Sequence, residues 1–233
     1  MFDFLKHRQH MSYIDRSTPI KEMRYVVVDT ELTGLDEGKD SIVSVGAVRM
    51  SGGRIDVGDS FYRLVNPGRP LTRDSVVIHG ITPSDVADEA GIGKALSDFV
   101  EFCGQDVLIG HCISIDLAFI KAEMQRSLGL ELQNPAADTL AIYEWTRLRE
   151  RHFKGESVSH GDLSLSRIAE GLGISVRGSH NALMDAFITA QVFQVFISKL
   201  SQAGVFTIGE LLDLGNPYKG GTSFKLSCGI SNF

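Results

Sequence analysis

The chain has 233 residues, of which 43% are hydrophobic and 22% are charged. This is the usual balance of a globular protein with one continuous core. The net charge of −6 and the pI near 5.6 argue against a protein that coats nucleic acid over a broad basic surface. Charged residues interrupt the apolar ones in MFDFLKHRQH, so we expect no secretory signal. We also expect no membrane span, because no run approaches about 18 apolar residues.

The number and spacing of the cysteines indicate the redox state of the compartment. Cys103, Cys112 and Cys228 lack the paired spacing of a metal site or a redox motif. A sparse, odd count predicts free thiols in a reducing cytoplasm.

The first part of the chain predicts an antiparallel meander. Residues 1–22 are mixed and polar, and we expect an N-terminal extension there. The β-branched run at 23–31 predicts a buried strand. Residues 41–50 and 54–65 predict two more strands, joined by a hairpin turn at 52–53.

The rest of the chain alternates between strand and helix patterns. A short buried strand is predicted at 106–111, and a weakly structured tail is predicted for the last 30 or so residues. Together the patterns predict an α/β fold: a mixed β-sheet, antiparallel meander first and parallel strands later, flanked by α-helices. Helices are predicted at 94–103, 114–128, 138–153, 163–173 and about 181–201.

Two acids occupy the end of the first predicted strand. Asp29 and Glu31 lie two residues apart, so their side chains point to the same face. A carboxylate on the buried face of a strand is costly unless it is paired or bound to a metal. The alternative is a strand end with two solvated acids before a turn at Thr33 and Gly34.

Two further acids lie at predicted helix starts. Asp116 follows the short buried strand, where an acid is also favoured simply because it is in a first helical turn. It is therefore either a site residue or a first-turn acid. Asp138 has the same alternatives, and we interpret it as a helix cap.

His180 and Asp185 allow two arrangements. Within one helix, five positions apart, they would lie about 140° apart and could hardly serve one small site. If the helix begins after His180, the histidine lies on a loop above the acid, and SVRGSHN supplies a glycine for that loop. The simpler alternatives are a capping histidine and an acid at the edge of an apolar face.

Taken together, the acids predict a metal site. Clustered carboxylates cannot all stay ionised unless something neutralises them. Hard divalent cations with oxygen ligands commonly do so. Two such ions about 3.5–4 Å apart suit hydrolysis of a phosphodiester, so we expect a nucleic-acid hydrolase.

The order and spacing of the motifs match one family. Over about residues 23–200 the chain resembles the DEDD-type exonuclease superfamily, histidine branch, and within it the proofreading epsilon-subunit group of bacterial DNA polymerase III and its stand-alone relatives. The motifs are DTELTGLD at 29–36, IHGITPSDV at 78–86, GHCISID at 110–116, ADTLAIY at 137–143 and HNALMDAFITAQVF at 180–193.

The resemblance implies a ribonuclease H-like fold and 3′→5′ removal of nucleoside 5′-monophosphates. It implies an exonuclease domain at 23–203, between the extension at 1–22 and a tail at 204–233. His180 would be the general base, a role that suits histidine. One of two Mg²⁺ or Mn²⁺ ions would activate the attacking water and the other would stabilise the leaving oxygen. The implied metal ligands are Asp29, Glu31, Asp116 and Asp185.

The resemblance also suggests substrate contacts. Leu32 and Thr33 would border the terminal nucleotide and His79 would lie near it, although His79 is equally explained as a turn residue before Gly80. Three positions, Leu32, Cys112 and Ile115, depart from residues common in the family. These changes concern the pocket lining, so they leave the substrate preference open.

A basic cluster ends the helix predicted at 138–153. It could hold phosphates. We favour the simpler explanation that cations complement the dipole at a helix C-terminus. The cluster comprises Arg147, Arg149, Arg151 and Lys154.

The sequence therefore favours a metal-dependent 3′→5′ exonuclease acting on single-stranded or frayed DNA in the cytoplasm, with no membrane association. One alternative is an oligoribonuclease-like enzyme acting on short RNA, because discrimination of the sugar depends on contacts to the 2′-hydroxyl. Another is a polymerase-associated proofreading or docking subunit. The short segment after the last predicted helix, without a clamp-binding motif, favours an independent enzyme. The oligomeric state stays open.

Overall fold

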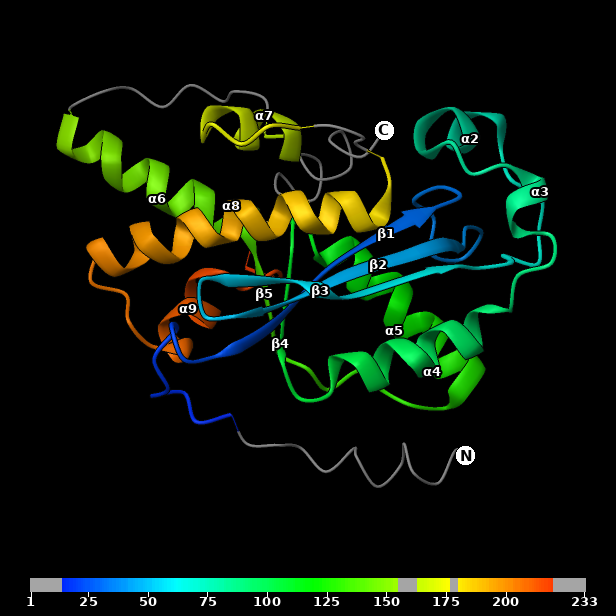
Figure 1. Cartoon of the computed structure of the whole chain (residues 1–233), viewed down its shortest axis with the longest axis horizontal. Coiled ribbons are helices and arrows are strands. Elements are labelled where there is room, and N and C mark those ends of the chain that lie inside the picture. Colours follow the sequence, from blue (N-terminus) through cyan, green and yellow to red (C-terminus); the bar gives the residue numbers. More distant parts are fainter. Residues whose placement is uncertain (1–13, 155–162, 177–179, 220–233) are drawn as a thin grey trace.

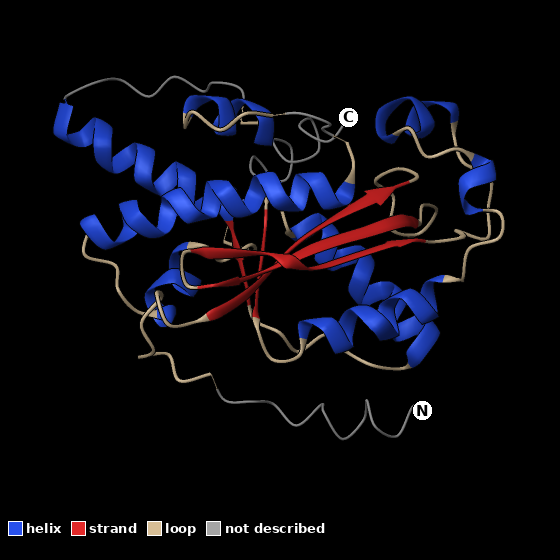
Figure 2. Cartoon of the chain, viewed as in Figure 1, coloured by secondary structure: helices blue, strands red, loops and turns tan. Residues whose placement is uncertain are grey.

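The structure is a computed structural model that describes residues 14–154, 163–176 and 180–219. Its centre is a five-stranded sheet with the strand order β3-β2-β1-β4-β5, and helices lie on both sides of it (Figures 1 and 2). The strands are β1 Arg24–Leu32, β2 Ile42–Ser51, β3 Arg54–Leu64, β4 Val107–Gly110 and β5 Ala136–Asp138.

The sheet is mixed, as the sequence predicts. Strand β1 pairs antiparallel with β2, and β2 pairs antiparallel with β3. On its other edge β1 pairs parallel with β4, which in turn pairs parallel with β5. The predicted class, an α/β fold with a meander followed by parallel strands, is confirmed.

The helices form two layers. Helices α6 to α9 contribute to the core on one side of the sheet, and α4 and α5 contribute to the core on the other. The five predicted helices are confirmed as α4 to α8, whereas the short elements α2, α3, α9 and β5 are not among the predicted ones. The helices are α2 Arg73–His79, α3 Pro83–Val86, α4 Ile92–Cys103, α5 Ser114–Leu128, α6 Thr139–Lys154, α7 Leu165–Gly171, α8 Ala182–Gln202 and α9 Ile208–Leu214.

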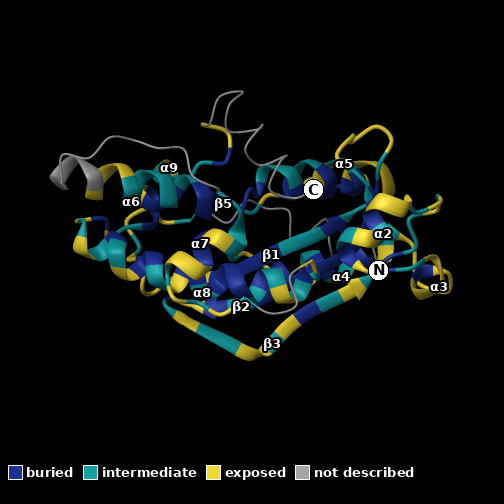
Figure 3. Ribbon diagram, turned by 90° about the horizontal axis from the view of Figure 1, so that it is seen from above, coloured by how far each residue is buried: buried dark blue, intermediate teal, exposed yellow. Residues whose placement is uncertain are grey.

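Both faces of β1 are covered. Tyr25 and Val27 belong to the core under α8, whereas Val26 and Val28 belong to the core under α4 and α5. The Tyr25 ring packs edge-on against Phe193 of α8, with 5.0 Å between ring centroids. Burying each large apolar side chain contributes about 1.5–3 kcal/mol, so β1 is fixed from both sides. By contrast, β3 at the edge of the sheet is more exposed than the central strand β2 (Figure 3).

Helix α8 is the central helix of one layer. It has 21 residues, and its most apolar 18-residue window has a mean hydropathy of 1.3, which by length and composition alone is enough to cross a membrane. The sequence prediction concerned an uninterrupted apolar run, which this helix does not contain, because Asp185, Gln191 and Gln194 interrupt it. Half of that window is buried inside the protein. The helix packs along β1 and β2, which explains its apolarity without a membrane.

The segments at 14–22 and 204–219 pack against each other. Pro19 forms a β-bridge with Thr207, and the Arg16 guanidinium donates to the Gly209 carbonyl at 3.0 Å. Ile20 and Leu211 are buried in the core. The expectation of a weakly structured tail is thus wrong for 204–219, while 1–13 and 220–233 lie outside the described residues.

The cysteines differ from one another. Cys103 is buried and free, as expected. Cys112 is disulfide-bonded, so the prediction of a free thiol is wrong there. Cys228 lies outside the described residues.

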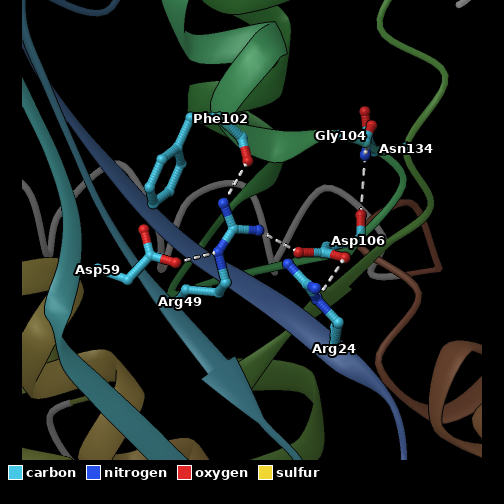
Figure 4. Close-up of polar contacts among 7 residues, drawn as sticks. All are labelled: Arg24, Arg49, Asp59, Phe102, Gly104, Asp106 and Asn134. Carbon is cyan, nitrogen blue, oxygen red and sulfur yellow. Dashed lines mark hydrogen bonds and ion pairs between the residues drawn. The ribbon is translucent and has the colours of Figure 1, made fainter.

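Arg49, whose side chain is 15% exposed, joins several elements at the end of the sheet where β1 and β4 begin (Figure 4). Arg49 donates to Asp59 of β3 at 2.6 Å and to the Phe102 carbonyl of α4 at 2.8 Å, and it forms an ion pair with Asp106. Its guanidinium also lies 4.5 Å from the centroid of the Phe102 ring. Arg24 adds a second ion pair to Asp106 at 3.3 Å. Arg49 therefore fastens β2 to its neighbours.

We predict that Arg49→Met lowers the free energy of unfolding by about 3 kcal/mol, because it leaves the nearly buried carboxylate of Asp106 without its main partner. Arg24→Met is the matched control. The Arg24 side chain is 59% exposed, so its loss should cost less than about 1 kcal/mol. Urea denaturation measures both values. Equal losses would contradict the central role of Arg49.

Candidate active site

The candidate site lies where β1 ends and where α5 and α8 begin. A cavity of about 110 Å³ opens there. The crevice beyond the carboxyl ends of the strands is a common site position in open α/β sheets. Its charged and polar lining includes Asp29, Glu31, Asp116, Asp185, His79, His111 and His180.

Three carboxylates meet in this cavity. Asp29 and Glu31 continue the alternation of Tyr25 and Val27 along β1, so they emerge on the α8 side of the sheet. Asp185 in the first turn of α8 meets them there. One ligand oxygen of each of the three lies within 4.8 Å of the others. The structure thus brings together residues that are more than 150 positions apart in the sequence.

Asp116 approaches from the other layer. It lies in the first turn of α5 and is 6% exposed. Its Oδ1 accepts hydrogen bonds from the Thr30 backbone N–H at 2.9 Å and from the Thr30 hydroxyl at 2.6 Å. Sequence reasoning missed Thr30. Its position between the two acids of β1 was the available signal.

The start of α8 distinguishes between the two arrangements considered for His180. The helix begins at Ala182, after a cap by Asn181, whose side chain accepts from the Met184 N–H at 3.3 Å. His180 precedes the helix with a left-handed backbone, φ 68°. Its N–H donates to Asp185 Oδ2 at 2.8 Å. The histidine therefore lies on the loop above the acid, and both line the cavity.

A glycine allows α8 to approach the sheet. Gly46 of β2 pairs with Asp29 of β1. A Cβ at position 46 would lie 2.2 Å from the Leu183 nitrogen and 2.3 Å from the Ala182 carbonyl carbon. These are backbone atoms of the helix, so any larger residue would push α8, and Asp185 with it, away from β1.

The acids strongly affect one another. Burial, followed by repulsion from Asp116, Asp185 and Glu31, raises the pKa of Asp29 well above its ordinary value. Burial and the neighbouring carboxylates raise the pKa of Glu31 to about 8. Burial raises the pKa of Asp116 to about 7, against the opposing effect of its bonds from Thr30. Such a group needs protons or cations to balance its charge.

This donor set fits a hard divalent cation. It offers carboxylate oxygens alone, the chemistry that Mg²⁺ and Mn²⁺ favour. The oxygens of Asp29, Glu31 and Asp185 are close enough to share one ion. Asp116 supplies a fourth carboxylate in the same cavity.

His79 is a turn residue whose side chain also lines the cavity. It ends α2, and its Nδ1 accepts the Ile81 N–H at 3.0 Å, as expected of a turn residue. Because Nδ1 is an acceptor, the ring proton of the neutral form lies on Nε2. Burial and His180 lower the pKa of His79, which favours that neutral form. Nε2 is buried without a hydrogen-bond partner in the described residues, and the side chain lines the cavity.

Leu32 and Thr33 have different positions. Leu32 lines the cavity, whereas Thr33 is not among the lining residues. The Thr33 hydroxyl donates to Asp40 at 2.9 Å and accepts the Ser41 N–H at 3.0 Å. Its side chain therefore stabilises the loop after β1 and does not border the cavity.

His111, which sequence reasoning did not single out, supports one wall of the cavity. Its Nε2 contacts the Leu163 carbonyl at 3.0 Å, and its Nδ1 contacts the Thr139 hydroxyl at 3.1 Å. Burial lowers its pKa to about 4, so the ring is neutral at ordinary pH. The segment that it anchors, 164–166, lines the cavity. A histidine directly after the buried strand was the signal in the sequence.

Asp138 caps α6, as predicted, and also holds the turn before α5. Its Oδ1 accepts the Leu140 N–H at 2.9 Å and the Cys112 N–H at 3.0 Å. Cys112 has a left-handed backbone, φ 54°, which is unfavourable for a residue with a side chain. The carboxylate therefore stabilises a strained turn that leads to Asp116.

The basic cluster lies away from the site. Helix α6 projects toward the end of the protein opposite to the last residues of β1 (Figure 1). The Arg147 guanidinium lies 5.8 Å from the Tyr143 ring centroid, and the Arg149 guanidinium lies 5.6 Å from that of Trp145. This supports a structural role; the side chains of Arg151 and Lys154 lie outside the described residues.

Solved structures share this fold. One is Exonuclease X in complex with 5′ overhanging duplex DNA, with a TM-score of 0.57 and 23% identity, covering 82% of this chain and 99% of that one. Another is Exonuclease I of E. coli with a dT13 oligonucleotide, with a TM-score of 0.65 and 14% identity, covering 78% and 43%. The predicted ribonuclease H-like architecture is confirmed.

The sequence shows the family. Residues 26–193 match the RNase T-type family described as Exonuclease. The chain belongs to this exonuclease family, which confirms the resemblance inferred from its motifs.

Several similar proteins are named as DNA polymerase III or as its epsilon subunit. The chain is 32% identical over 176 residues to the DNA polymerase III subunit epsilon of Aquifex aeolicus, covering 76% of this chain and 81% of that protein. It is 32% identical over 187 residues to the PolC-type DNA polymerase III of Thermotoga maritima, covering 80% of this chain but only 13% of that polymerase. It is 35% identical to an epsilon-like protein of Rhodobacter capsulatus, covering 84% of this chain and 27% of that protein.

We predict that stabilisation by a divalent cation grows as the pH rises. The raised pKa values mean that the folded, metal-free protein keeps protons that the unfolded chain releases, so its stability falls as pH rises through the window from about 4.5 to about 8 for Glu31. A bound cation replaces those protons and removes the loss. The increase in Tm on adding Mn²⁺ should therefore be larger at about pH 8 than at about pH 5.5.

Differential scanning fluorimetry measures the effect. The double variant Asp29→Asn, Glu31→Gln is the control and should show little increase at either pH, because two of the four carboxylates are neutral. An increase in Tm that does not depend on pH would contradict the prediction.

Proposed function

We propose that the chain is a metal-dependent 3′→5′ exonuclease that removes nucleoside 5′-monophosphates from the 3′ ends of single-stranded or frayed DNA. The observation that carries the proposal is the meeting of Asp29, Glu31 and Asp185 within 4.8 Å, in a chain of the exonuclease family. Neighbours of the same fold are named for complexes with a dT13 oligonucleotide and with overhanging duplex DNA.

Four acids would hold the cations. Asp29, Glu31 and Asp185 would share one ion, and Asp116 would complete the ligand set. When bound, two Mg²⁺ or Mn²⁺ ions supply an activated water and stabilise the leaving 3′-oxygen. The cations would also neutralise carboxylates whose pKa values are raised by burial and, for Asp29 and Glu31, by the neighbouring acids.

His180 would act as the general base. Its backbone N–H is held by Asp185 at 2.8 Å, which sets the loop at the edge of the acid cluster. The side chain lines the same cavity as the acids. From there the imidazole could take a proton from the attacking water, as a general base within hydrogen-bond reach does.

The terminal nucleotide would lie between apolar and polar walls. Leu32 and Ile115 line the cavity as apolar contacts. His79 offers an N–H donor on Nε2 that has no hydrogen-bond partner in the described part of the chain. A buried donor without a partner is costly, so an acceptor on the nucleotide is the natural complement.

Two alternatives to an independent DNA exonuclease are considered. The acids do not distinguish DNA from RNA, so an oligoribonuclease-like activity on short RNA shares every residue named above. The relatives named as epsilon and PolC-type DNA polymerase III support a polymerase-associated proofreading or docking subunit. In either case we propose a cytoplasmic protein without membrane association, whose oligomeric state is open.

The decisive experiment follows 5′-labelled single strands of DNA and RNA with the same sequence, in Mg²⁺, Mn²⁺ or EDTA. We expect a ladder that shortens from the 3′ end, faster on DNA, and that is abolished by EDTA. His180→Ala should lower kcat by about 10²- to 10⁴-fold, as for loss of a general base.

Asp213→Asn on α9 is the control for the loss of an acid and should cleave normally, since Asp213 is exposed and pairs with Arg16. Asp185→Asn should be inactive. If neither substrate is degraded with either metal, the independent nuclease is excluded and the docking subunit takes its place. Faster cleavage of RNA would select the oligoribonuclease-like alternative.

We also predict that two substitutions of His79 separate its two hydrogen bonds. In His79→Asn the amide oxygen can still accept the Ile81 N–H, but the donor at Nε2 is lost, so KM should rise about three- to tenfold with kcat little changed. In His79→Gln the amide reaches the Nε2 position, so KM should stay near normal while stability falls by about 1 kcal/mol.

Steady-state kinetics and urea denaturation of the two variants give these four values. An Asn variant with unchanged KM would show that His79 is a turn residue only.

A further inference from the structure

Thr30 lies between the two acids of β1 but makes its contact on the α5 side. Alternation along a strand sends its side chain to the opposite face from Asp29 and Glu31. There its hydroxyl donates to Asp116 Oδ1 at 2.6 Å. Residues 29–31 therefore contact both layers of helices.

The backbone of Thr30 adds a second bond to the same oxygen. Strand β4 pairs with β1 only through the register from Tyr25 to Val27. Strand β4 ends one residue later, at Gly110, and the Thr30 N–H donates instead to Asp116 Oδ1 at 2.9 Å. Asp116 thus takes the place of a strand partner at the point where the sheet opens.

Two donors on one oxygen orient the whole carboxylate. The distance of 2.6 Å is that of a charge-assisted O–H···O⁻ bond, one of the stronger hydrogen bonds in proteins. With Oδ1 held by both donors, Oδ2 is the oxygen available to a cation. The Asp116 backbone N–H also bonds to this carboxylate, so without the Thr30 donors only this local bond within its own helix would set its orientation.

We propose that Thr30 is a positioning residue for the cation site: it holds Asp116 so that Oδ2 is presented to the cations bound by Asp29, Glu31 and Asp185. This inference rests on the proposed function, because it assumes that the four acids bind cations. Groups that orient metal ligands in this way typically change metal affinity by 10- to 100-fold.

The test compares Thr30→Val with Thr30→Ser in the full chain. Valine keeps the branched shape and suits a strand, but it lacks the hydroxyl, whereas serine keeps the hydroxyl. Titration with Mn²⁺, followed by electron paramagnetic resonance and by calorimetry, gives the number of ions and their affinities without substrate. Valine should weaken at least one Mn²⁺ about 10-fold or more, and serine should bind within about threefold of the wild type.

Cleavage kinetics provide a second measurement. The valine variant should lose kcat at fixed Mn²⁺ and recover when Mn²⁺ is raised, while KM for the oligonucleotide stays unchanged. A purely structural loss of shape would not be rescued by serine or by metal. Thr30→Ala replaces valine if valine does not give folded protein, with the same expectation for Mn²⁺ affinity.

The outcomes separate this inference from the proposed function. Wild-type affinity in the valine or alanine variant overturns the role of Thr30 and leaves the cation site intact. A serine variant as weak as valine overturns the role of the hydroxyl. A wild-type chain that binds no Mn²⁺ overturns the proposed cation site, and this inference with it.

Discussion

Repulsion among four carboxylates is the constraint on which the rest of the site depends. Asp29, Glu31, Asp116 and Asp185 are held close together and largely away from water, and burial raises the pKa of each of them. Nothing in this arrangement favours folding on its own account. The apolar packing on both faces of β1 must offset its cost until a cation or protons neutralise the charge.

The fold holds the acids in place through contacts that do not themselves bind metal. Gly46 lets the start of α8 reach the sheet, so Asp185 arrives over Asp29. Thr30 holds Asp116 from the end of β1. Asp138 stabilises the left-handed turn that leads into α5. Three different elements thus converge because each is fixed by backbone or short-range polar contacts, which tolerate little displacement.

The three histidines of the cavity are distinguished by their partners and not by their position. Both ring nitrogens of His111 contact protein groups, and burial keeps it neutral, so it can only support the wall. The Nδ1 of His79 accepts a backbone N–H, whereas its Nε2 has no hydrogen-bond partner among the described residues. His180 is fixed through its backbone N–H, and its side chain lines the cavity.

The sequence by itself determined the mixed sheet and its main helices, because residue alternation, β-branched runs and helical spacing reflect local steric preferences that neighbouring residues alone set. It also singled out the four acids and His180, since the motifs that contain them match those of one exonuclease family in order and spacing. Only the tertiary structure decided that α8 begins after His180, that the Thr33 side chain is taken by its own loop, and that Thr30 and His111 support the site. It also decided that 204–219 packs onto the folded domain, with Val205, Ile208 and Leu211 in its core. These facts depend on contacts between distant segments, and local pattern carries no information about which backbone groups those segments leave free.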